Sequence, residues 1–192
     1  ILVDGREQKD LMQDVGFIIE RPEYIPYYSA KKNLEIIAAY RKVADDQRIC
    51  TVLEMFGLDP SDKKAVGKYS LGMKQKLALS MAFLEDPKVL ILDEPLSALD
   101  ADSVQEARKR ILEEKERGKL VLIASHYPED IQSLCDKVYW MKNGHVLPSK
   151  ENVRSEVPDT INSIDNKHNR ERMNVQEVPD TINLEDKGRR VE

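Results

Sequence analysis

Two adjacent carboxylates, Asp93 and Glu94, directly follow the apolar run Val89-Leu90-Ile91-Leu92. Such a run is typical of a strand in a parallel sheet, and open α/β sheets bind ligands beyond the carboxyl ends of their strands. One carboxylate there could hold a hydrated Mg²⁺. The other could orient or deprotonate a water that attacks phosphorus. A polar strand end without chemistry is the alternative interpretation.

A histidine follows a second apolar run. The segment 120–124 (LVLIA) leads into Ser125-His126, so His126 is expected at the same sheet edge as Asp93 and Glu94. A neutral imidazole at that edge could hydrogen-bond a terminal phosphate or the attacking water. Taken alone, His126 could equally be a structural histidine.

A third candidate segment, Tyr69-Ser70-Leu71-Gly72-Met73, opens a helical pattern that continues to Leu84. Ser70 can cap this helix through its hydroxyl, and Gly72 permits a close approach of the backbone. A helix N-terminus with free N–H groups is suited to bind phosphate. A plain capped helix is the alternative.

Strands and helices alternate around these residues. Apolar runs predict buried strands at 15–19, 89–92 and 120–124, and a hairpin is expected with its turn at 142–144. Helices are expected at 29–40, 48–56, 71–84, 101–116 and 129–135. This alternation predicts an α/β fold built from βαβ units around a parallel sheet.

Composition narrows the classes of function. The 192 residues include 30 basic and 35 acidic side chains, for a net charge of −5. A chain without a basic excess is not expected to bind nucleic acid. No apolar run approaches the ~20 residues of a membrane-spanning helix, so direct membrane insertion is not expected. Only two cysteines occur, without zinc-site spacing, which favours the cytoplasm.

The last part of the chain, residues 149–192, has a different composition. It contains 10 apolar residues among 44 and no aromatic one, too few to offset the entropy of ordering, so a flexible, disordered tail is expected. The sequence EVPDTIN occurs in it twice, at 156–162 and 177–183. The repeat is either a duplication without function or a short docking motif.

The block YSLGMKQKLALSMAFLEDPKVLILDEPLSALD, residues 69–100, resembles the signature-to-Walker-B region of ABC transporter ATPases. The resemblance extends over about residues 1–147. It implies a partial P-loop NTPase-type domain at 1–148, with a helical subdomain at about 24–86 that touches a membrane permease.

The resemblance implies a role for each matching residue. Asp93 would hold Mg²⁺, Glu94 would be the general base, and His126 would be the switch histidine. Glu20 stands at the Q-loop position, as a further residue near ATP and the metal. The signature and the D-loop complete the set, with contacts to ATP and to the opposite subunit: Ser70, Leu71, Gly72 and Met73 in the signature, and Asp100 at the end of the D-loop.

Two positions depart from the usual family pattern. Most members have Ser-Gly-Gly-Gln where this chain has residues 70–73 (SLGM), and Gln where it has Glu20. Both departures resemble the bacitracin- and lantibiotic-type exporters. The phosphate-binding motif G-x-x-x-x-G-K-[ST], called Walker A, is not found in the 192 residues. We therefore expect this chain to be a fragment that is inactive in ATP hydrolysis on its own.

The function expected from this resemblance is that of the ATP-binding subunit of an ABC-type exporter. ATP and Mg²⁺ would be its cofactors, a membrane permease its partner, and a homo- or heterodimer of ATPase domains its assembly. It would lie in the cytoplasm, peripherally at the inner face of the cell membrane. A non-transport ABC ATPase and a non-catalytic regulatory chain are the alternatives.

Overall fold

The structure is a computed structural model that describes residues 2–3, 6–7, 14–19, 23–41, 44–142 and 144–146. Glu20 and the predicted tail at 149–192 lie outside the described residues. The described elements, in chain order, are β1 (Leu2–Val3), β2 (Arg6–Glu7), β3 (Val15–Ile18), α1 (Ala30–Arg41), α2 (Asp46–Met55), the 3₁₀ helix η1 (Val66–Lys68), α3 (Leu71–Phe83), β4 (Val89–Asp93), α4 (Ala101–Glu116), β5 (Leu120–Ala124), α5 (Pro128–Leu134), β6 (Met141–Lys142) and β7 (His145–Val146).

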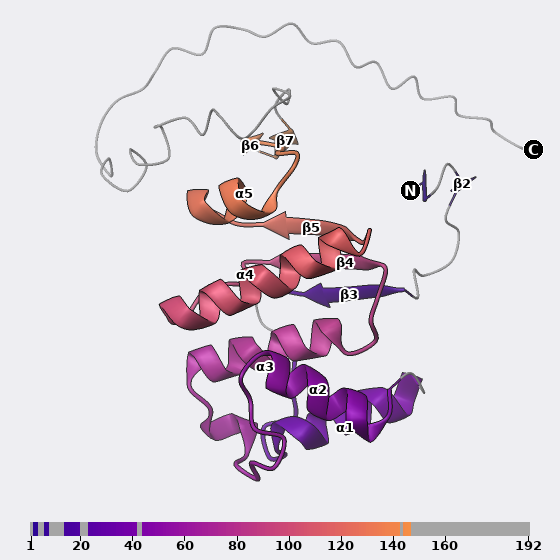
Figure 1. Cartoon of the computed structure of the whole chain (residues 1–192), viewed down its shortest axis with the longest axis vertical. Coiled ribbons are helices and arrows are strands. Elements are labelled where there is room, and N and C mark those ends of the chain that lie inside the picture. Colours follow the sequence, from indigo (N-terminus) through magenta and orange to yellow (C-terminus); the bar gives the residue numbers. More distant parts are fainter. Residues whose placement is uncertain are drawn as a thin grey trace, which may run out of the picture. The chain divides into compact units, whose positions relative to one another are not determined.

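Three parallel strands form the central sheet in the order β3, β4, β5 (Figure 1). Helices α1 to α3 connect β3 to β4, and α4 connects β4 to β5. The register pairs Ile18 with Leu92, and Leu92 with Ile123. The carboxyl ends of the three strands therefore lie at one edge. This arrangement confirms the predicted α/β fold with a parallel sheet.

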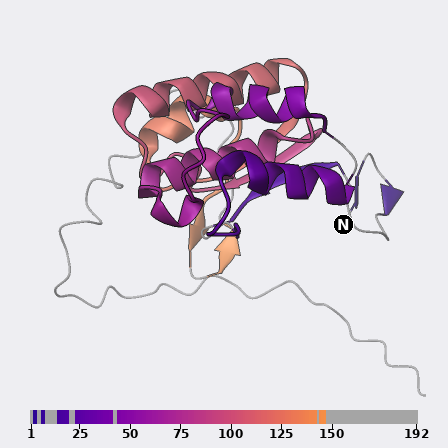
Figure 2. The same ribbon diagram turned by 90° about the horizontal axis from the view of Figure 1, so that it is seen from below.

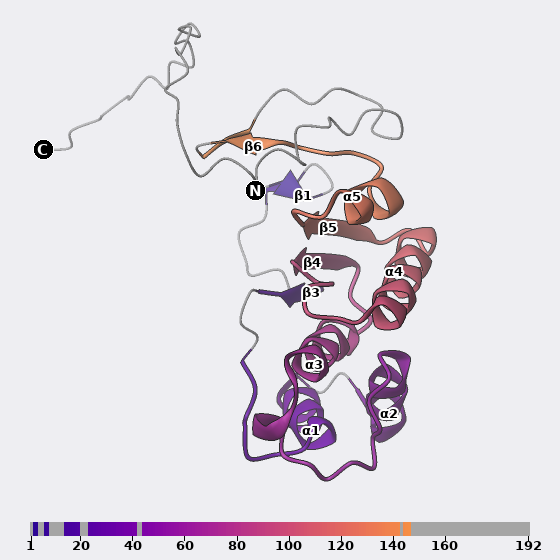
Figure 3. The ribbon, with the colours of Figure 1, turned by 90° about the vertical axis from the view of Figure 1, so that its left-hand side faces the viewer.

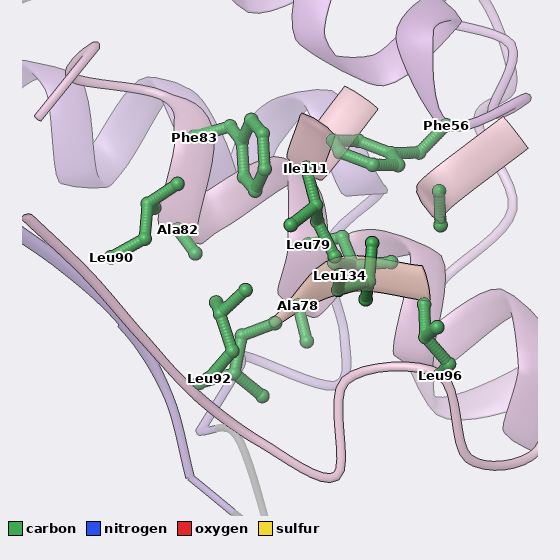
Figure 4. Close-up of a cluster of buried hydrophobic side chains, with 12 residues drawn as sticks. Phe56, Ala78, Leu79, Ala82, Phe83, Leu90, Leu92, Leu96, Ile111 and Leu134 are labelled. Atoms are coloured by element: carbon green, nitrogen blue, oxygen red, sulfur yellow. The ribbon is translucent and has the colours of Figure 1, made fainter. Parts of the chain in front are cut away.

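One face of the sheet carries the main hydrophobic core (Figure 4). Leu90 and Leu92 of β4 are buried beneath side chains of α3, α4 and α5. The rings of Phe56 and Phe83 meet edge to face, with centroids 5.1 Å apart. Figure 3 shows α4 and α5 on this side of the strands. Burying a leucine or phenylalanine side chain contributes about 1.5–3 kcal/mol, so this face supplies much of the stability.

The opposite face of the sheet differs from the prediction. Phe17, Ile91 and Leu122 form one cross-strand row and are 58%, 40% and 56% exposed. Leu120 of β5 is also exposed. The all-apolar runs predict strands buried on both sides, and this is wrong for these side chains. The reason is that the described helices in the main core pack against one face only.

Helices α1, α2 and α3 pack together (Figure 2) and share a second buried cluster. Leu34, Val52 and Leu77 are fully buried in it, one from each helix. Arg48 of α2 donates hydrogen bonds to the carbonyl oxygens of Phe83 (2.6 Å) and Leu84 (3.1 Å). A cation at the last carbonyl groups of α3 also interacts favourably with the negative end of the helix dipole. These helices fall within the predicted helical subdomain at 24–86, whose boundaries remain a prediction.

Capping residues set the helix ends. Asp45 accepts a hydrogen bond from the amide of Arg48 at 2.8 Å, so α2 begins at Asp46, earlier than predicted. Gly118 follows α4 with φ +84°, a conformation that glycine adopts without strain. Helix α4 has the predicted bounds. The predicted hairpin is formed by β6 and β7, which pair antiparallel.

An ion-pair network joins the segments before β4 and β5. Arg117 donates two hydrogen bonds to the Asp86 carboxylate, at 2.8 and 2.9 Å. Lys119 pairs with Asp86 and also with Glu114 of α4. The Arg117 hydrogen bonds, with those of Lys119, lower the pKa of Asp86 to about 2. The network fixes the end of α4 against the starts of two strands.

Gly16 of β3 should not tolerate a side chain. A Cβ atom at this position would lie 2.0 Å from the carbonyl oxygen of Ala82 and 2.8 Å from Pro87 Cγ. We expect Gly16→Ala to lower the free energy of unfolding by about 1–3 kcal/mol, as overpacking does, measured by urea denaturation. Gly67→Ala is the control, because its nearest contact would be 3.1 Å. An equal loss in both variants would contradict this packing argument.

The Asp86 network should make stability depend on pH. Because the fold lowers the pKa of Asp86 from its ordinary value of 3.8 to about 2, its ionisation favours the folded state above pH ~4, and this contribution disappears as the pH falls toward 2. Asp86→Asn should therefore flatten the loss of unfolding free energy between pH 4 and 2. Asn tolerates the φ of +50° found here. Asp102→Asn, outside the network, should leave the pH slope unchanged.

Candidate functional site

The carboxyl edge of the sheet brings three of the predicted residues together. Asp93 ends β4 and is paired in register with Ala124, the last residue of β5. The amide of Glu94 donates to the carbonyl oxygen of Ala124 at 2.9 Å, which extends the pairing by one step. His126 follows two residues after β5. The parallel register therefore sets Asp93, Glu94 and His126 at neighbouring strand ends, as the sequence predicts.

Glu94 and His126 are in direct contact. One carboxylate oxygen, Oε1, lies 2.7 Å from Nδ1 of the imidazole and accepts a hydrogen bond from the His126 amide at 3.1 Å. The Glu94 side chain is 29% exposed and the His126 side chain 68%. Oε2 of Glu94 is buried and has no hydrogen-bond partner among the described residues. One oxygen is thus used for positioning and the other is left for a further partner.

The contact defines the hydrogen on the imidazole. An ionised carboxylate only accepts hydrogen bonds, so Nδ1 of a neutral His126 must carry its hydrogen toward Glu94. Nε2 is then an acceptor, and it becomes a donor when the ring is protonated. The exposed edge of His126 can therefore accept from a water or, when charged, donate to an anion.

The main chain of Glu94 is held from three directions. Its carbonyl oxygen accepts from Ser97 Oγ (2.8 Å), from the Ser97 amide (3.2 Å) and from Gln75 Nε2 (3.2 Å). Gln75 Nε2 also donates to the carbonyl oxygen of Pro95 at 2.9 Å. Glu94 has φ +45°, in the left-handed region. Gln75 thus links α3, the helix that begins with the predicted phosphate-binding segment 70–73, to the backbone of Glu94.

The predicted phosphate-binding segment begins α3. Ser70 is its N-cap, and its hydroxyl accepts from the amide of Met73 at 3.2 Å, as predicted. The Leu71 side chain is exposed. Gly72 packs against the backbone of Ala98, because a Cβ on Gly72 would lie 2.9 Å from the Ala98 carbonyl oxygen. The close approach predicted for Gly72 is therefore used within the chain.

Asp100 caps α4. One carboxylate oxygen accepts from the amide of Ser103 and the other from its hydroxyl, both at 2.9 Å. These hydrogen bonds lower the pKa of Asp100 below its usual value. The carboxylate expected to take part in contacts between subunits thus also fixes the start of α4.

Some residues of this site were not found from the sequence. Gln75 is a single polar residue among others in a helical pattern, and its partners are the main-chain carbonyl oxygens of Glu94 and Pro95. Only tertiary structure brings them together, so no local pattern marks them. Ser97 stands three residues after Glu94, a spacing that could have suggested a turn.

Asp93 and Glu94 suit a magnesium–nucleotide site. Among the described residues, no group of three or more His, Cys, Asp or Glu side chains is arranged to hold a metal ion. Mg²⁺ usually takes only one or two protein carboxylates, with waters and phosphate oxygens. Glu94 directly follows Asp93, and its Oε2 is an acceptor without a partner among the described residues. The residues present therefore fit such a group.

Within the described part of the chain, no helix is long and apolar enough to cross a bilayer.

Comparisons with known proteins agree on one family. The family model described as "ABC transporter" matches residues 1–97. The uncharacterized ABC transporter ATP-binding protein YybJ of Bacillus subtilis is 40% identical over 79% of this chain and 71% of its own length. The lantibiotic transport ATP-binding protein SrtF of Streptococcus pyogenes is 35% identical, over 81% of this chain and 68% of its own.

Further comparisons concern a second transporter and the fold. The bacitracin transport ATP-binding protein BcrA of Bacillus licheniformis is 38% identical over 74% of this chain, which spans only 47% of BcrA. The ATP-binding cassette MJ0796, solved as a dimer bound to ADP and Pi, superposes with a TM-score of 0.67 at 20% identity, over 78% of this chain and 71% of that one. This likeness shows the same fold.

Replacing Gln75 tests its link to Glu94. Gln75→Leu removes two hydrogen bonds from α3 to the carbonyl oxygens of Glu94 and Pro95. We expect the free energy of unfolding in urea to fall by about 1–2 kcal/mol. Gln47→Leu, on the exposed side of α2, should change it by less than about 0.5 kcal/mol. Equal effects would show that the Gln75 hydrogen bonds add no stability.

Proposed function

The chain belongs to the ABC transporter family, and we propose that it is the ATP-binding and ATP-hydrolysing subunit of an exporter that works through a separate membrane permease. The similarity to SrtF and BcrA, lantibiotic and bacitracin transport proteins, favours a peptide antibiotic as the cargo. The observation that carries the proposal is the contact of Glu94 with His126 at the carboxyl edge of the parallel sheet.

The geometry supports a division of work between Glu94 and His126. Glu94 Oε1 is occupied by His126, so Oε2, which has no partner among the described residues, is the oxygen that accepts the proton of the attacking water. His126 holds the carboxylate in orientation through Nδ1. Its Nε2 edge faces outward and can contact the terminal phosphate. General-base catalysis of this kind contributes about 10²–10⁴ in rate.

The nucleotide and the metal ion would be held around this pair. Asp93 is the residue we assign to Mg²⁺, which supplies charge neutralisation on the phosphates when bound. Glu20 is assigned to the same region by its position after β3. Ser70, Leu71, Gly72 and Met73 are assigned to contact ATP bound by a second ATPase chain, in a homo- or heterodimer. The exposed start of α3 supports this.

A surface for the permease is proposed on the loop that precedes α1. Tyr27 is 85% exposed, and Ile25 and Tyr28 are also exposed. The loop is nevertheless well anchored, because the buried Asn33 side chain accepts from the Ile25 amide at 2.7 Å and donates to its carbonyl oxygen at 3.1 Å. A fixed loop with outward aromatic side chains suits protein recognition. Contact there would hold the chain at the cytoplasmic face of the membrane.

The test is ATP hydrolysis by the membrane complex. The protein as its own cells make it, affinity-tagged and purified in detergent, should carry a multi-spanning permease and hydrolyse Mg-ATP. Glu94→Gln should lower kcat about 100-fold or more and leave ATP binding intact. Glu35→Gln, an exposed carboxylate of α1 that pairs with Lys32, is the control and should keep full activity.

The polypeptide of residues 1–192 alone should show negligible hydrolysis, since it contains no G-x-x-x-x-G-K-[ST]. Robust activity of this polypeptide, abolished by Glu94→Gln, would overturn that expectation. Co-sedimentation with ribosomes in place of a permease would favour a non-transport ABC ATPase. Capture of a partner through residues 149–192, without dependence on nucleotide, would favour a regulatory chain.

A further inference from the structure

A buried carboxylate lies one helical turn beyond His126. The Asp130 side chain, in α5, is 4% exposed, and an isolated charge in such surroundings is strongly disfavoured. Arg108 of α4 compensates it. Both Nε (2.9 Å) and Nη2 of the guanidinium reach the same carboxylate oxygen, Oδ1. The second oxygen, Oδ2, is thereby left for another partner.

That partner is the residue before His126. Ser125 Oγ donates to Asp130 Oδ2 at 3.2 Å and accepts from the amide of Tyr127 at 3.1 Å. The amide of Asp130 donates to the Tyr127 carbonyl oxygen at 3.2 Å. Both neighbours of His126 are therefore tied to Asp130, one through its hydroxyl and the other through its main chain.

This arrangement has a direct consequence for the imidazole. The amide and the ring of His126 both reach Oε1 of Glu94, which requires the backbone of this turn to keep one position. We infer that Asp130, neutralised by Arg108 and acting through Ser125, is a positioning residue for His126. Its task is to keep the imidazole in the tautomer that donates from Nδ1 to Glu94. The catalytic meaning of this role rests on the function proposed above.

A simpler role for Asp130 is a tether between α4 and α5. The chain contains a comparable pair for comparison, because Lys115 of α4 reaches Asp136, just beyond α5, at 2.7 Å. Asp136 makes no hydrogen bond or ion pair with the described residues 125–127. A variant at Asp136 therefore weakens the packing of the same two elements without touching the turn that carries His126.

The experiment reads the tautomer of His126 by nitrogen-15 NMR of the full 192-residue chain at pH 8, without nucleotide. The chain has three histidines, and substitutions at His145 and His168 assign the signals. The wild-type imidazole should carry its hydrogen mainly on Nδ1. In Ser125→Ala, which leaves the Arg108 pair in place, and in Asp130→Asn, both tautomers should become populated. Ser125→Thr keeps a hydroxyl and should restore the Nδ1 form, and Asp136→Asn should leave it unchanged.

Three results would overturn the inference. They are an unchanged tautomer in Ser125→Ala, an equal change in Asp136→Asn, and failure of Ser125→Thr to restore the wild-type signal while its amide spectrum shows a folded chain. The measurement needs no ATP. If Ser125→Ala loses the Nδ1 form but the wild-type complex shows no ATPase activity, the positioning role is upheld and only the proposed function is refuted.

Discussion

The main chain of Glu94 is the point on which this fold depends. Its amide continues the ladder between β4 and β5, and its carbonyl oxygen is shared by Gln75 and Ser97. A hydrogen bond left unmade at a buried group costs more than one made contributes. The sheet, the helix that begins at Leu71 and the turn after β4 therefore keep their relative positions together.

The two ends of the sheet are built on different physics. At the amino ends of β4 and β5, charges are paired, because Asp86 and Glu114 together balance Arg117 and Lys119. At the carboxyl ends, Glu94 has one carboxylate oxygen without a partner among the described residues. A fold that is electrostatically satisfied at one edge can hold an unsatisfied group at the other. The ion pairs that stabilise the fold and the carboxylate proposed for catalysis therefore lie at opposite ends of the strands.

Much of this arrangement follows from sequence patterns. The placement of Glu94 and His126 at neighbouring strand ends was predicted, because parallel strands end at a common edge. The bounds of α4 were predicted from the sequence, and the structure adds that Asp100 is its N-cap. The burial of Phe17 and Leu122 was predicted wrongly, since an apolar run does not reveal which face a helix covers. The roles of Gln75 and Asp130 could not be found, because Gln75 binds the carbonyl oxygens of Glu94 and Pro95 and Asp130 pairs with Arg108, all distant in sequence.

The backbone conformation of Glu94 sets the chemistry of this residue against its stability. A non-glycine residue at φ +45° carries a conformational cost of order 1–3 kcal/mol, and glycine would avoid most of it. A mutation to glycine would remove the carboxylate and relieve the backbone at once. Selection for the carboxylate and selection for a stable backbone therefore act on position 94 in opposite directions. In a gene copy that is no longer selected for ATP hydrolysis, we expect the glutamate at this position to be replaced early.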